Sequence, residues 1–288
     1  MYTYSLVQWM MFFFVYCFFG WCIESAIVSI QKRRFVNRGF LRIPMLPLYG
    51  FGAVLILFLT IPVKDKIQLV YIVGMIGATI LEYLTGWAME GLFKMKYWDY
   101  SNQRFQLHGR ICLSSSLFWG VLSVALTEYI HPPIEHWILG LSHTAITVTV
   151  SITACVMLID TVVSARAALD LAKVLEHLAA AKDEIEHIHT QIEDLKNAAQ
   201  QQLGDLKENA QQQLEDIKEA KDTVQAQLKE HTEQLKERLS ELTEQRESEM
   251  SHLGFLKQQL LKGHPSAYSQ KFNTTLRELK EQLYKKKG

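Results

Sequence analysis

Residues 81–120 read LEYLTGWAMEGLFKMKYWDYSNQRFQLHGRICLSSSLFWG and lead from one apolar segment through a short polar loop into the next. The loop is crowded with Lys, Arg, Trp and Tyr side chains, and His108 and Arg110 lie near its end. Glu82 and Glu90 lie in the apolar part that precedes it. Because charged groups are costly at membrane depth, those that occur there are candidates for function. The stretch therefore predicts two membrane helices joined by a loop with candidate functional residues.

Outward from this stretch, further segments are apolar over about the 20 residues that a helix needs to cross a bilayer. Five such segments run over residues 6–30, 44–62, 67–93, 111–130 and 137–159. The first is too long and too aromatic for a signal peptide, so we expect it to be retained as a helix. Gly74 and Ala78, four residues apart, favour close packing of the third helix, and ordinary glycine usage in membrane helices is the alternative.

Charged residues predict the orientation. Residues 1–160 contain 11 Lys or Arg and 8 Asp or Glu, whereas residues 161–288 contain 19 and 22. The loops at 31–42 and 94–110 are basic. Of the other two connections, residues 61–66 contain two lysines and an aspartate, and residues 131–136 contain no Lys or Arg. An excess of Lys and Arg marks the cytoplasmic side. We therefore expect a multi-pass plasma-membrane protein whose N-terminus is outside and whose chain after Asp160 is cytoplasmic.

A helical pattern replaces the apolar segments after about residue 165. Apolar residues recur every 11 positions, at Leu195, Leu206, Ile217, Leu228, Leu239, Met250 and Leu261. A companion row holds Ile192, Leu203 and Leu214. This period corresponds to 3.67 residues per turn, which favours a straight or slightly right-handed supercoil. We expect one long helix that continues to about residue 262, weakened locally at Gly204 and Gly254.

The predicted fold class is all-α: a polytopic membrane helix bundle of about five helices, followed by a long cytoplasmic helical or coiled-coil stalk. The predicted domains are the transmembrane domain at 1–160, the stalk at 161–262, and a C-terminal region at 263–288. That last region contains an amphipathic helix and a basic tail at Lys285, Lys286 and Lys287. The apolar face of the stalk is too narrow for a globular core, so we expect self-association or a partner helix. A helix lying on the membrane surface is the alternative.

Five polar residues are candidates for an intramembrane pocket on the cytoplasmic side: Glu24, Glu82, Glu90, His108 and Arg110. A carboxylate buried in a membrane must be protonated, paired or hydrated. We expect Arg110 to face Glu24 or Glu82, and His108 to be able to move a proton or bind a phosphate group. The alternative pairs Glu90 with Lys94, four residues later, and leaves Arg110 among lipid headgroups.

Several motifs are absent from the whole sequence: the P-loop G-x-x-x-x-G-K-[ST], G-x-S-x-G, H-E-x-x-H and C-x-x-C. The four cysteines lie in apolar segments without metal-ligand spacing. We therefore predict no enzyme activity, no catalytic residue, no cofactor, no metal and no nucleic-acid partner. The bilayer is the expected environment.

Three stretches carry a resemblance to a known family: residues 17–25 (CFFGWCIES), 37–53 (NRGFLRIPMLPLYGFGA) and 81–120. They resemble the bacterial family called putative ABC-transporter type IV, the CmpB-like permeases, over residues 10–160. Ile43 stands where the family pattern has Gly. The resemblance implies a transport protein of unknown substrate that works with a separate ATPase subunit. The alternative is a membrane-anchored scaffold or sensor that acts through its cytoplasmic coiled coil.

Overall fold

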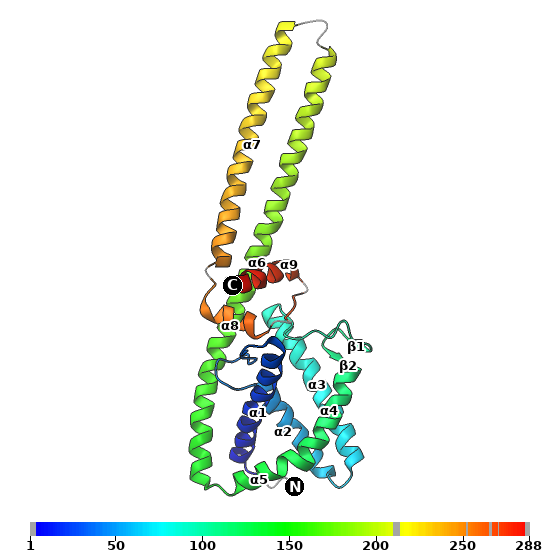
Figure 1. Ribbon diagram of the computed structural model, residues 1–288, viewed down its shortest axis with the longest axis vertical. Helices are drawn as coiled ribbons and strands as arrows, with labels where there is room; N and C mark the ends of the chain where they lie inside the picture. Colours follow the sequence, from blue (N-terminus) through cyan, green and yellow to red (C-terminus); the bar gives the residue numbers. More distant parts are fainter. Residues whose placement is uncertain (1–3, 210–213, 252, 265–266, 270, 286–288) are drawn as a thin grey trace. The chain divides into compact units, whose positions relative to one another are not determined.

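Helices make up nearly all of the regular structure in the computed structural model (Figure 1). The structure describes residues 4–209, 214–251, 253–264, 267–269 and 271–285. It divides into two compact units. Unit 1 contains Met1–Ala172 and Gly254–Leu276, and unit 2 contains Lys173–Leu253 and Arg277–Gly288. Residues 254–276 thus return to the unit that holds the apolar helices, although they follow the long helical region in sequence.

Unit 1 is built from apolar helices with short connections. Its elements are α1 (Leu6–Lys32), α2 (Pro47–Thr60), η1 (Ile61–Val63), α3 (Ile67–Phe93), β1 (Gln106–Leu107), β2 (Ile111–Cys112), α4 (Leu113–Ala125), η2 (Leu126–Ile130), α5 (His131–Leu139), the first part of α6 (His143–Asn209), and α8 (Phe255–Gly263). α1 begins with a capping box, in which the Ser5 hydroxyl accepts a hydrogen bond from the Gln8 N–H and the Gln8 side chain accepts one from the Ser5 N–H. α3 ends where Lys94 adopts a positive φ.

Among the described residues, four helical segments are long and apolar enough to cross a membrane: Leu6–Lys32, Ile67–Phe93, Leu113–Leu139 and His143–Ala198. α2 together with η1, at Pro47–Val63, is apolar but shorter. The prediction of five spans is therefore not confirmed. The predicted fifth segment, which began at residue 137, is wrong at its start. α5 already occupies His131–Leu139, because Pro132 and Pro133 lie in its first turn, where a missing N–H is tolerated.

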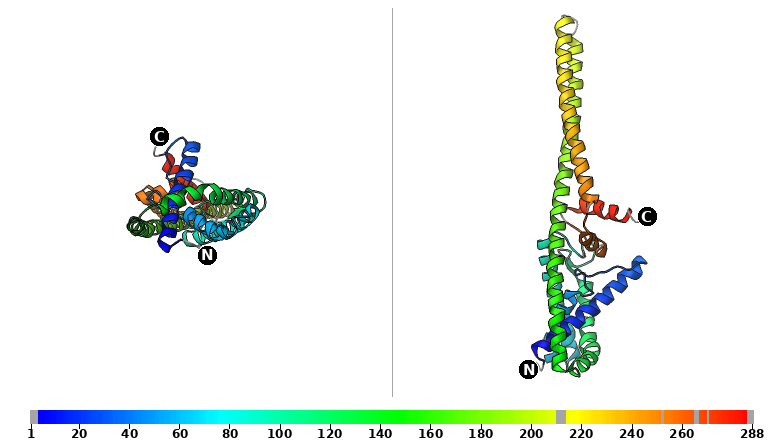
Figure 2. Two further views of the ribbon diagram at one scale, coloured as in Figure 1. Left: turned by 90° about the horizontal axis from the view of Figure 1, so that it is seen from below. Right: turned by 90° about the vertical axis from the view of Figure 1, so that its left-hand side faces the viewer.

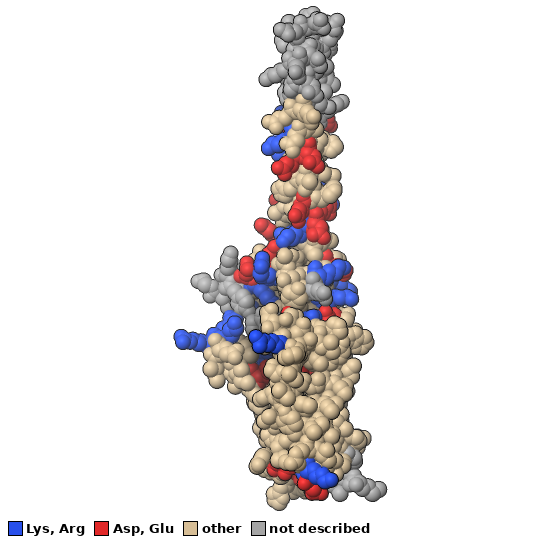
Figure 3. All heavy atoms as spheres, turned by 90° about the vertical axis from the view of Figure 1, so that its right-hand side faces the viewer, with Lys and Arg blue, Asp and Glu red and all other residues tan. Residues whose placement is uncertain are grey.

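The surface of unit 1 suits a bilayer. On the face drawn in Figure 3, a continuous band without Lys, Arg, Asp or Glu separates charged residues at its two ends. Large apolar side chains on this unit are half exposed or more, including Phe58, Ile76, Ile80, Val121 and Ile152. Such surface would be costly in water but is at no disadvantage against lipid chains.

Small residues allow the membrane helices to approach closely. A Cβ atom added to Gly74 of α3 would collide with Ser123 of α4, and one added to Gly77 would lie 2.5 Å from Leu59 of α2. The predicted close packing around Gly74 is thus present, with α4 as the neighbour. Aromatic side chains fill the core on the other side, where Phe12, Phe13 and Tyr16 of α1 are buried with Leu57 of α2.

The two ends of unit 1 carry different elements. Figure 1 shows β1, β2 and α8 at one end of the helices, and α5 and the first described residues at the other. The connection between α1 and α2 and the connection between α3 and α4 both lie at the end with α8. The two basic loops that the sequence places on one side of the membrane therefore share one end of the unit.

Unit 2 is a helical hairpin with a third helix against it. The last part of α6 and α7 (Leu214–Ser251) run antiparallel and side by side (Figures 1 and 2). Arg238 of α7 forms an ion pair with Glu184 of α6, with 3.3 Å between Nη2 and Oε1. The prediction of one unbroken helix to residue 262 is wrong, because α6 ends at Asn209, α7 ends at Ser251, and α8 follows Gly254. α6 does continue through Gly204. Within this unit, α6 and α7 of the same chain thus lie against each other, and the predicted self-association or partner helix stays a prediction.

The apolar rows of the repeat are only partly visible. Leu239 and Leu195 are half-buried, and Met250 and Leu261 are buried. The side chains of Leu203, Leu206, Leu214, Ile217 and Leu228, together with Lys286 and Lys287 of the predicted tail, lie outside the described residues. The predicted C-terminal amphipathic face is formed by α9 (Asn273–Lys285), on which Leu276, Leu279 and Leu283 are buried.

Candidate functional site

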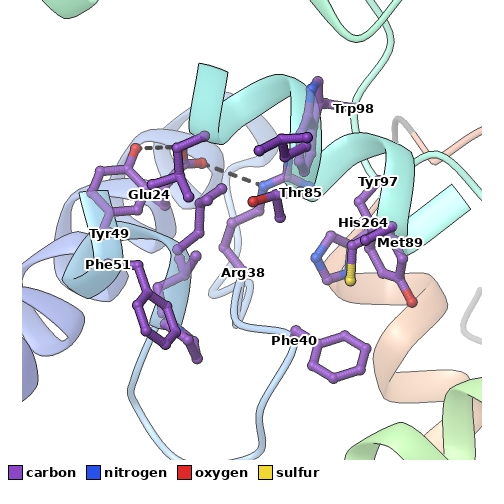
Figure 4. Close-up of a pocket in the computed structure, with 16 residues that line it drawn as sticks. Glu24, Arg38, Phe40, Tyr49, Phe51, Thr85, Met89, Tyr97, Trp98 and His264 are labelled. Atoms are coloured by element: carbon purple, nitrogen blue, oxygen red, sulfur yellow. Dashed lines mark hydrogen bonds and ion pairs between the residues drawn. The ribbon is translucent and has the colours of Figure 1, made fainter. Parts of the chain in front are cut away.

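A cavity of about 470 Å³ lies within unit 1 (Figure 4). Its walls come from α1, α2 and α3, from the two basic loops, and from His264, which directly follows α8. Most of the lining side chains are apolar or aromatic, and Glu24 and Arg38 are the carboxylate and guanidinium among them. A largely apolar cavity with a few convergent polar groups is the usual form of a ligand site.

Glu24 and Arg38 form an ion pair at one end of this cavity. The Glu24 carboxylate accepts a hydrogen bond from the Tyr49 hydroxyl at 2.8 Å and one from Arg38 Nε at 3.4 Å (Figure 4). Arg38 also donates through Nη1 to the backbone carbonyl of Gly263 at 3.2 Å. Its third nitrogen, Nη2, has no partner among the residues that the structure describes. The guanidinium thus keeps a donor for a further anionic group.

One face of α1 holds the loop that carries Arg38. Trp21, Ser25 and Ser29 are spaced by four residues, so they lie on the same side of the helix. The Trp21 ring N–H donates to the Asn37 side chain at 2.7 Å, and the Ser25 hydroxyl accepts from the Arg38 N–H at 3.2 Å. The Ser29 hydroxyl accepts from the Val36 N–H at 2.9 Å. The loop is therefore folded back along α1, and Arg38 reaches Glu24.

Asp160 fixes the far part of the same loop. Its carboxylate is buried and accepts hydrogen bonds from the backbone N–H groups of Arg42 at 2.7 Å and Ile43 at 3.1 Å. The Arg42 guanidinium lies 3.8 Å from the same carboxylate, but its side chain is largely exposed. Ile43 thus contributes its backbone N–H to this attachment. Arg42 is bound outside the cavity and offers a natural comparison with Arg38.

The segment after α8 closes the other side of the cavity. The His264 ring lies edge-on to the Tyr97 ring, with 4.7 Å between the centroids. Lys96 and Tyr268 exchange two backbone hydrogen bonds, of 2.7 and 2.9 Å, and the Ser269 hydroxyl donates to the Lys94 carbonyl at 2.7 Å. Burial raises the pKa of the Tyr97 phenol, so that its hydroxyl stays protonated. This hydroxyl has no hydrogen-bond partner among the described residues.

Glu82 belongs to a second network, next to the first. Its carboxylate accepts hydrogen bonds from the Trp119 ring N–H at 3.0 Å, the Tyr100 hydroxyl at 3.1 Å and the Ser115 hydroxyl at 3.4 Å. All three donors are neutral groups. The rings of Tyr49 and Trp119 lie 6.3 Å apart and connect this network with that of Glu24. α1, α2, α3 and α4 therefore meet through polar contacts at this level.

Arg110 forms a third network with Glu90. Its Nη2 and Nε atoms donate to one Glu90 oxygen at 2.7 and 3.0 Å. The guanidinium also lies 5.4 Å from the centre of the Tyr83 ring and donates to the Tyr83 hydroxyl at 3.3 Å. That hydroxyl is 3.2 Å from His108 Nδ1. Three of the five predicted residues, Glu90, His108 and Arg110, are thus brought together around Tyr83.

The expected pairing of Arg110 with Glu24 or Glu82 is wrong. The β1–β2 hairpin places His108 and Gly109 at positive φ, and Trp98 donates its ring N–H to the Arg110 carbonyl at 2.9 Å. This backbone position puts the guanidinium beside Glu90, near the end of α3. The alternative ion pair of Glu90 with Lys94 is not formed either, because both hydrogen bonds described for the Glu90 carboxylate come from Arg110, and the bond from Lys94 joins its backbone N–H to the Glu90 carbonyl.

Residues 11–165 match the model of a family described as putative ABC-transporter type IV. The chain belongs to this family. No curated protein matches the chain, and no solved structure does. The match to an ABC-transporter family and the four apolar helices together make it a membrane protein. The family region contains Glu24, Arg38 and Tyr49, whereas His264 lies outside it. One wall of the cavity is thus added by a part of this chain that the family model does not cover.

Sequence analysis missed six residues that hold these networks or line the cavity: Arg38, Tyr49, Tyr83, Tyr100, Trp119 and His264. Arg38 was visible as a loop arginine, and the spacing of Trp21, Ser25 and Ser29 could have indicated that the loop folds onto α1. His264 had no such signal, because Arg38 and Gly263 are 225 positions apart. In the part of the chain that the structure describes, no group of three His, Cys, Asp or Glu side chains is arranged to hold a metal.

Proposed function

We propose that this protein is the membrane-spanning subunit of a transporter whose ATPase is a separate chain. In this proposal, the cavity at Glu24 and Arg38 receives the transported ligand. The cavity carries the proposal. It is lined in part by α1 and α3, which are long and apolar enough for a membrane span, and it contains an ion pair whose Arg38 Nη2 has no partner among the described residues. Membership in an ABC-transporter family favours an ATP-driven process. The sequence contains no P-loop, so ATP must be hydrolysed elsewhere.

The proposed orientation places the end with α8 in the cytoplasm of a plasma membrane. Arg33, Arg34, Arg38 and Arg42 lie in one connection at that end, and Lys94, Lys96, Arg104 and Arg110 in the other. The opposite connection between η1 and α3 holds Lys64 and Lys66 beside Asp65. This asymmetry supports a cytoplasmic location for both basic loops and for unit 2. An ATPase would then have access to the end of the unit where the cavity lies.

Orientation can be tested with single cysteines in a cysteine-free background. Arg104 is exposed and serves as the cytoplasmic probe, whereas the Arg38 side chain in the other basic loop is only 17% exposed. An impermeant thiol reagent added to intact cells should label Lys64→Cys and spare Arg104→Cys, and both should react after the cells are opened. Labelling of Arg104→Cys in intact cells would overturn the orientation.

The transporter proposal predicts a P-loop protein bound to the full chain. The chain is purified with a tag from its own membrane, and the co-purified proteins are identified by mass spectrometry. The complex is then tested for ATP hydrolysis that depends on the cavity. Hydrolysis should fall in Arg38→Gln and stay unchanged in Arg42→Gln, because only Arg38 lines the cavity. Absence of a bound ATPase, combined with a phenotype that depends on the α6–α7 hairpin alone, would support the scaffold alternative instead.

A further inference from the structure

The two ends of the cavity differ in chemistry. One end holds the ion pair of Glu24 and Arg38 with the Tyr49 hydroxyl. The wall made by α2 and α3 is apolar and includes Phe51 and Leu84. A ligand that satisfies both ends has a small charged group and a hydrocarbon part. This combination is the definition of an amphiphile.

The cavity opens between α2 and α3. Phe51 of α2 and Leu84 of α3 line it, yet their side chains are 58% and 52% exposed. Residues that both line a cavity and remain more than half exposed mark its mouth. Leu84 belongs to the candidate span Ile67–Phe93, so the mouth faces hydrocarbon when the protein is in a bilayer. The ion pair joins the cavity to the basic loop after α1, because Arg38 belongs to that loop and Glu24 to α1.

The charges favour a zwitterionic group over a purely anionic one. Arg38 offers its unused Nη2 donor to a phosphate oxygen, and arginine suits phosphate binding. Glu24, however, lies beside it and would repel a ligand that carries only negative charge. A carboxylate next to a guanidinium complements an ammonium next to a phosphate. The bond between Arg38 Nε and Glu24, at 3.4 Å, is long, so an ammonium group competes with a weak contact.

We infer that the cavity binds a zwitterionic phospholipid of the ethanolamine class, which enters from the bilayer between Phe51 and Leu84. Its phosphate contacts Arg38, its ammonium contacts Glu24, and its acyl chains leave through the mouth. This inference rests on the proposed function in one respect, since it names the ligand of the transporter cavity. Binding itself needs no ATP and no partner subunit.

A photoreactive lipid tests the inference directly. The full chain is placed in nanodiscs that contain phosphatidylethanolamine with a diazirine in its acyl chain, and the labelled peptides are mapped by mass spectrometry. Labelling should concentrate around Phe51 and Leu84. Unlabelled phosphatidylethanolamine should compete, whereas phosphatidylglycerol and inorganic phosphate should not. Arg38→Gln should reduce labelling at the mouth about tenfold, as expected for the loss of a hydrogen bond to a charged group.

Matched variants separate the cavity from the general lipid surface. Leu84→Trp fills the mouth and should abolish the concentrated labelling. Ile80→Trp is its control, because Ile80 lies one turn away on α3, is 54% exposed and does not line the cavity. Arg42→Gln is the control for Arg38→Gln. Both controls should label like the unchanged chain.

Several outcomes would overturn the inference. Equal labelling around Ile80 and Leu84 would mean ordinary lipid contact. Equal competition by phosphatidylglycerol would mean that the site accepts anionic lipids. Competition by inorganic phosphate would mean that the site binds a free anion. Failure of the two proposals can be told apart. Lipid binding without an ATPase partner would leave the inference intact and overturn the transporter. ATP hydrolysis that depends on Arg38, without labelling at the mouth, would support the transporter and overturn the lipid inference.

Discussion

Two arginine–glutamate pairs in unit 1 use the same chemistry in different surroundings. Arg110 donates two hydrogen bonds to one Glu90 oxygen, lies over the Tyr83 ring, and comes from a loop tied down by a β-hairpin. Arg38 donates one long hydrogen bond to Glu24 through Nε and one to Gly263 through Nη1, while its Nη2, beside a cavity, has no partner among the residues that the structure describes. The residue types are identical, and the two pairs differ in how many guanidinium nitrogens of the arginine have a hydrogen-bond partner. Arg110 and Glu90 therefore form a structural ion pair, which we call the Arg110 clamp. Arg38 and Glu24 form a site that can accept a ligand.

The largest expected effect is on the Arg110 clamp. Arg110→Leu leaves Glu90 unpaired in a position where its side chain is only 20% exposed, which should cost roughly 3 kcal/mol of stability. Thermal unfolding in detergent measures the loss. The double variant Arg110→Leu with Glu90→Leu should recover most of it, because no charge is then left without a partner. Additive losses in the double variant would show that the two side chains do not act as a pair.

A smaller effect on stability is expected at Arg38. Arg38→Gln removes one long ion pair and the bond to Gly263, so thermal stability should fall by about 1 kcal/mol. Arg42→Gln, whose side chain is 53% exposed, should change stability by less than about 0.5 kcal/mol. A loss at Arg38 as large as that at Arg110 would remove the distinction between a clamp and a site, because both arginines would then be structural.

A modest, pH-dependent effect is expected for a cluster of three charged side chains in unit 2. Glu278 of α9 binds Lys182 of α6 and Arg246 of α7. Burial opposes its ionisation, but the hydrogen bond from Lys182 and the charge of Arg246 outweigh burial and hold the pKa of Glu278 below its usual range. A lowered folded-state pKa stabilises the fold above the unfolded pKa of about 4.3, and this contribution is lost as the pH falls through the folded-state value.

Amide hydrogen exchange in α9 measures this contribution. At neutral pH, Glu278→Gln should exchange faster than the unchanged chain, by an amount that corresponds to less than about 1 kcal/mol, because the pair is partly exposed. The difference should vanish in acid, below the folded-state pKa. A difference that persists there would mean that the carboxylate charge of Glu278 does not hold α9 against α6 and α7.

The sequence carried the local features of the fold but not the long-range ones. Hydropathy was sufficient for α1 and α3, whose bounds lie close to the predicted ones. Residues 131–136 were predicted to connect two spans, although Pro132 and Pro133 both fit the first turn of α5. The stalk pattern gave the correct type of structure, but a periodic apolar stripe does not say whether its partner is another chain or a reversed part of the same one.

The candidate site shows the same limit. Glu24, Glu82, Glu90 and Arg110 could be selected because charge in an apolar segment is visible in a single window. The residues that bind these side chains could not be selected from sequence, because Arg38, Tyr49 and Trp119 are ordinary residues for a loop or a membrane helix. Pairing depended on how the loop after α1 folds back and on where the β-hairpin holds Arg110.

The return of residues 254–276 to unit 1 has a consequence for biosynthesis. The helices that bear Glu24, Tyr49 and Leu84 leave the ribosome well before Gly263 and His264 exist, and domains fold as their residues emerge. The cavity is therefore assembled in two stages, first three helices and an ion pair, and later the wall at His264. During that interval the site is open on one side. A chain whose synthesis stops within α7 would insert in the membrane with the site unfinished.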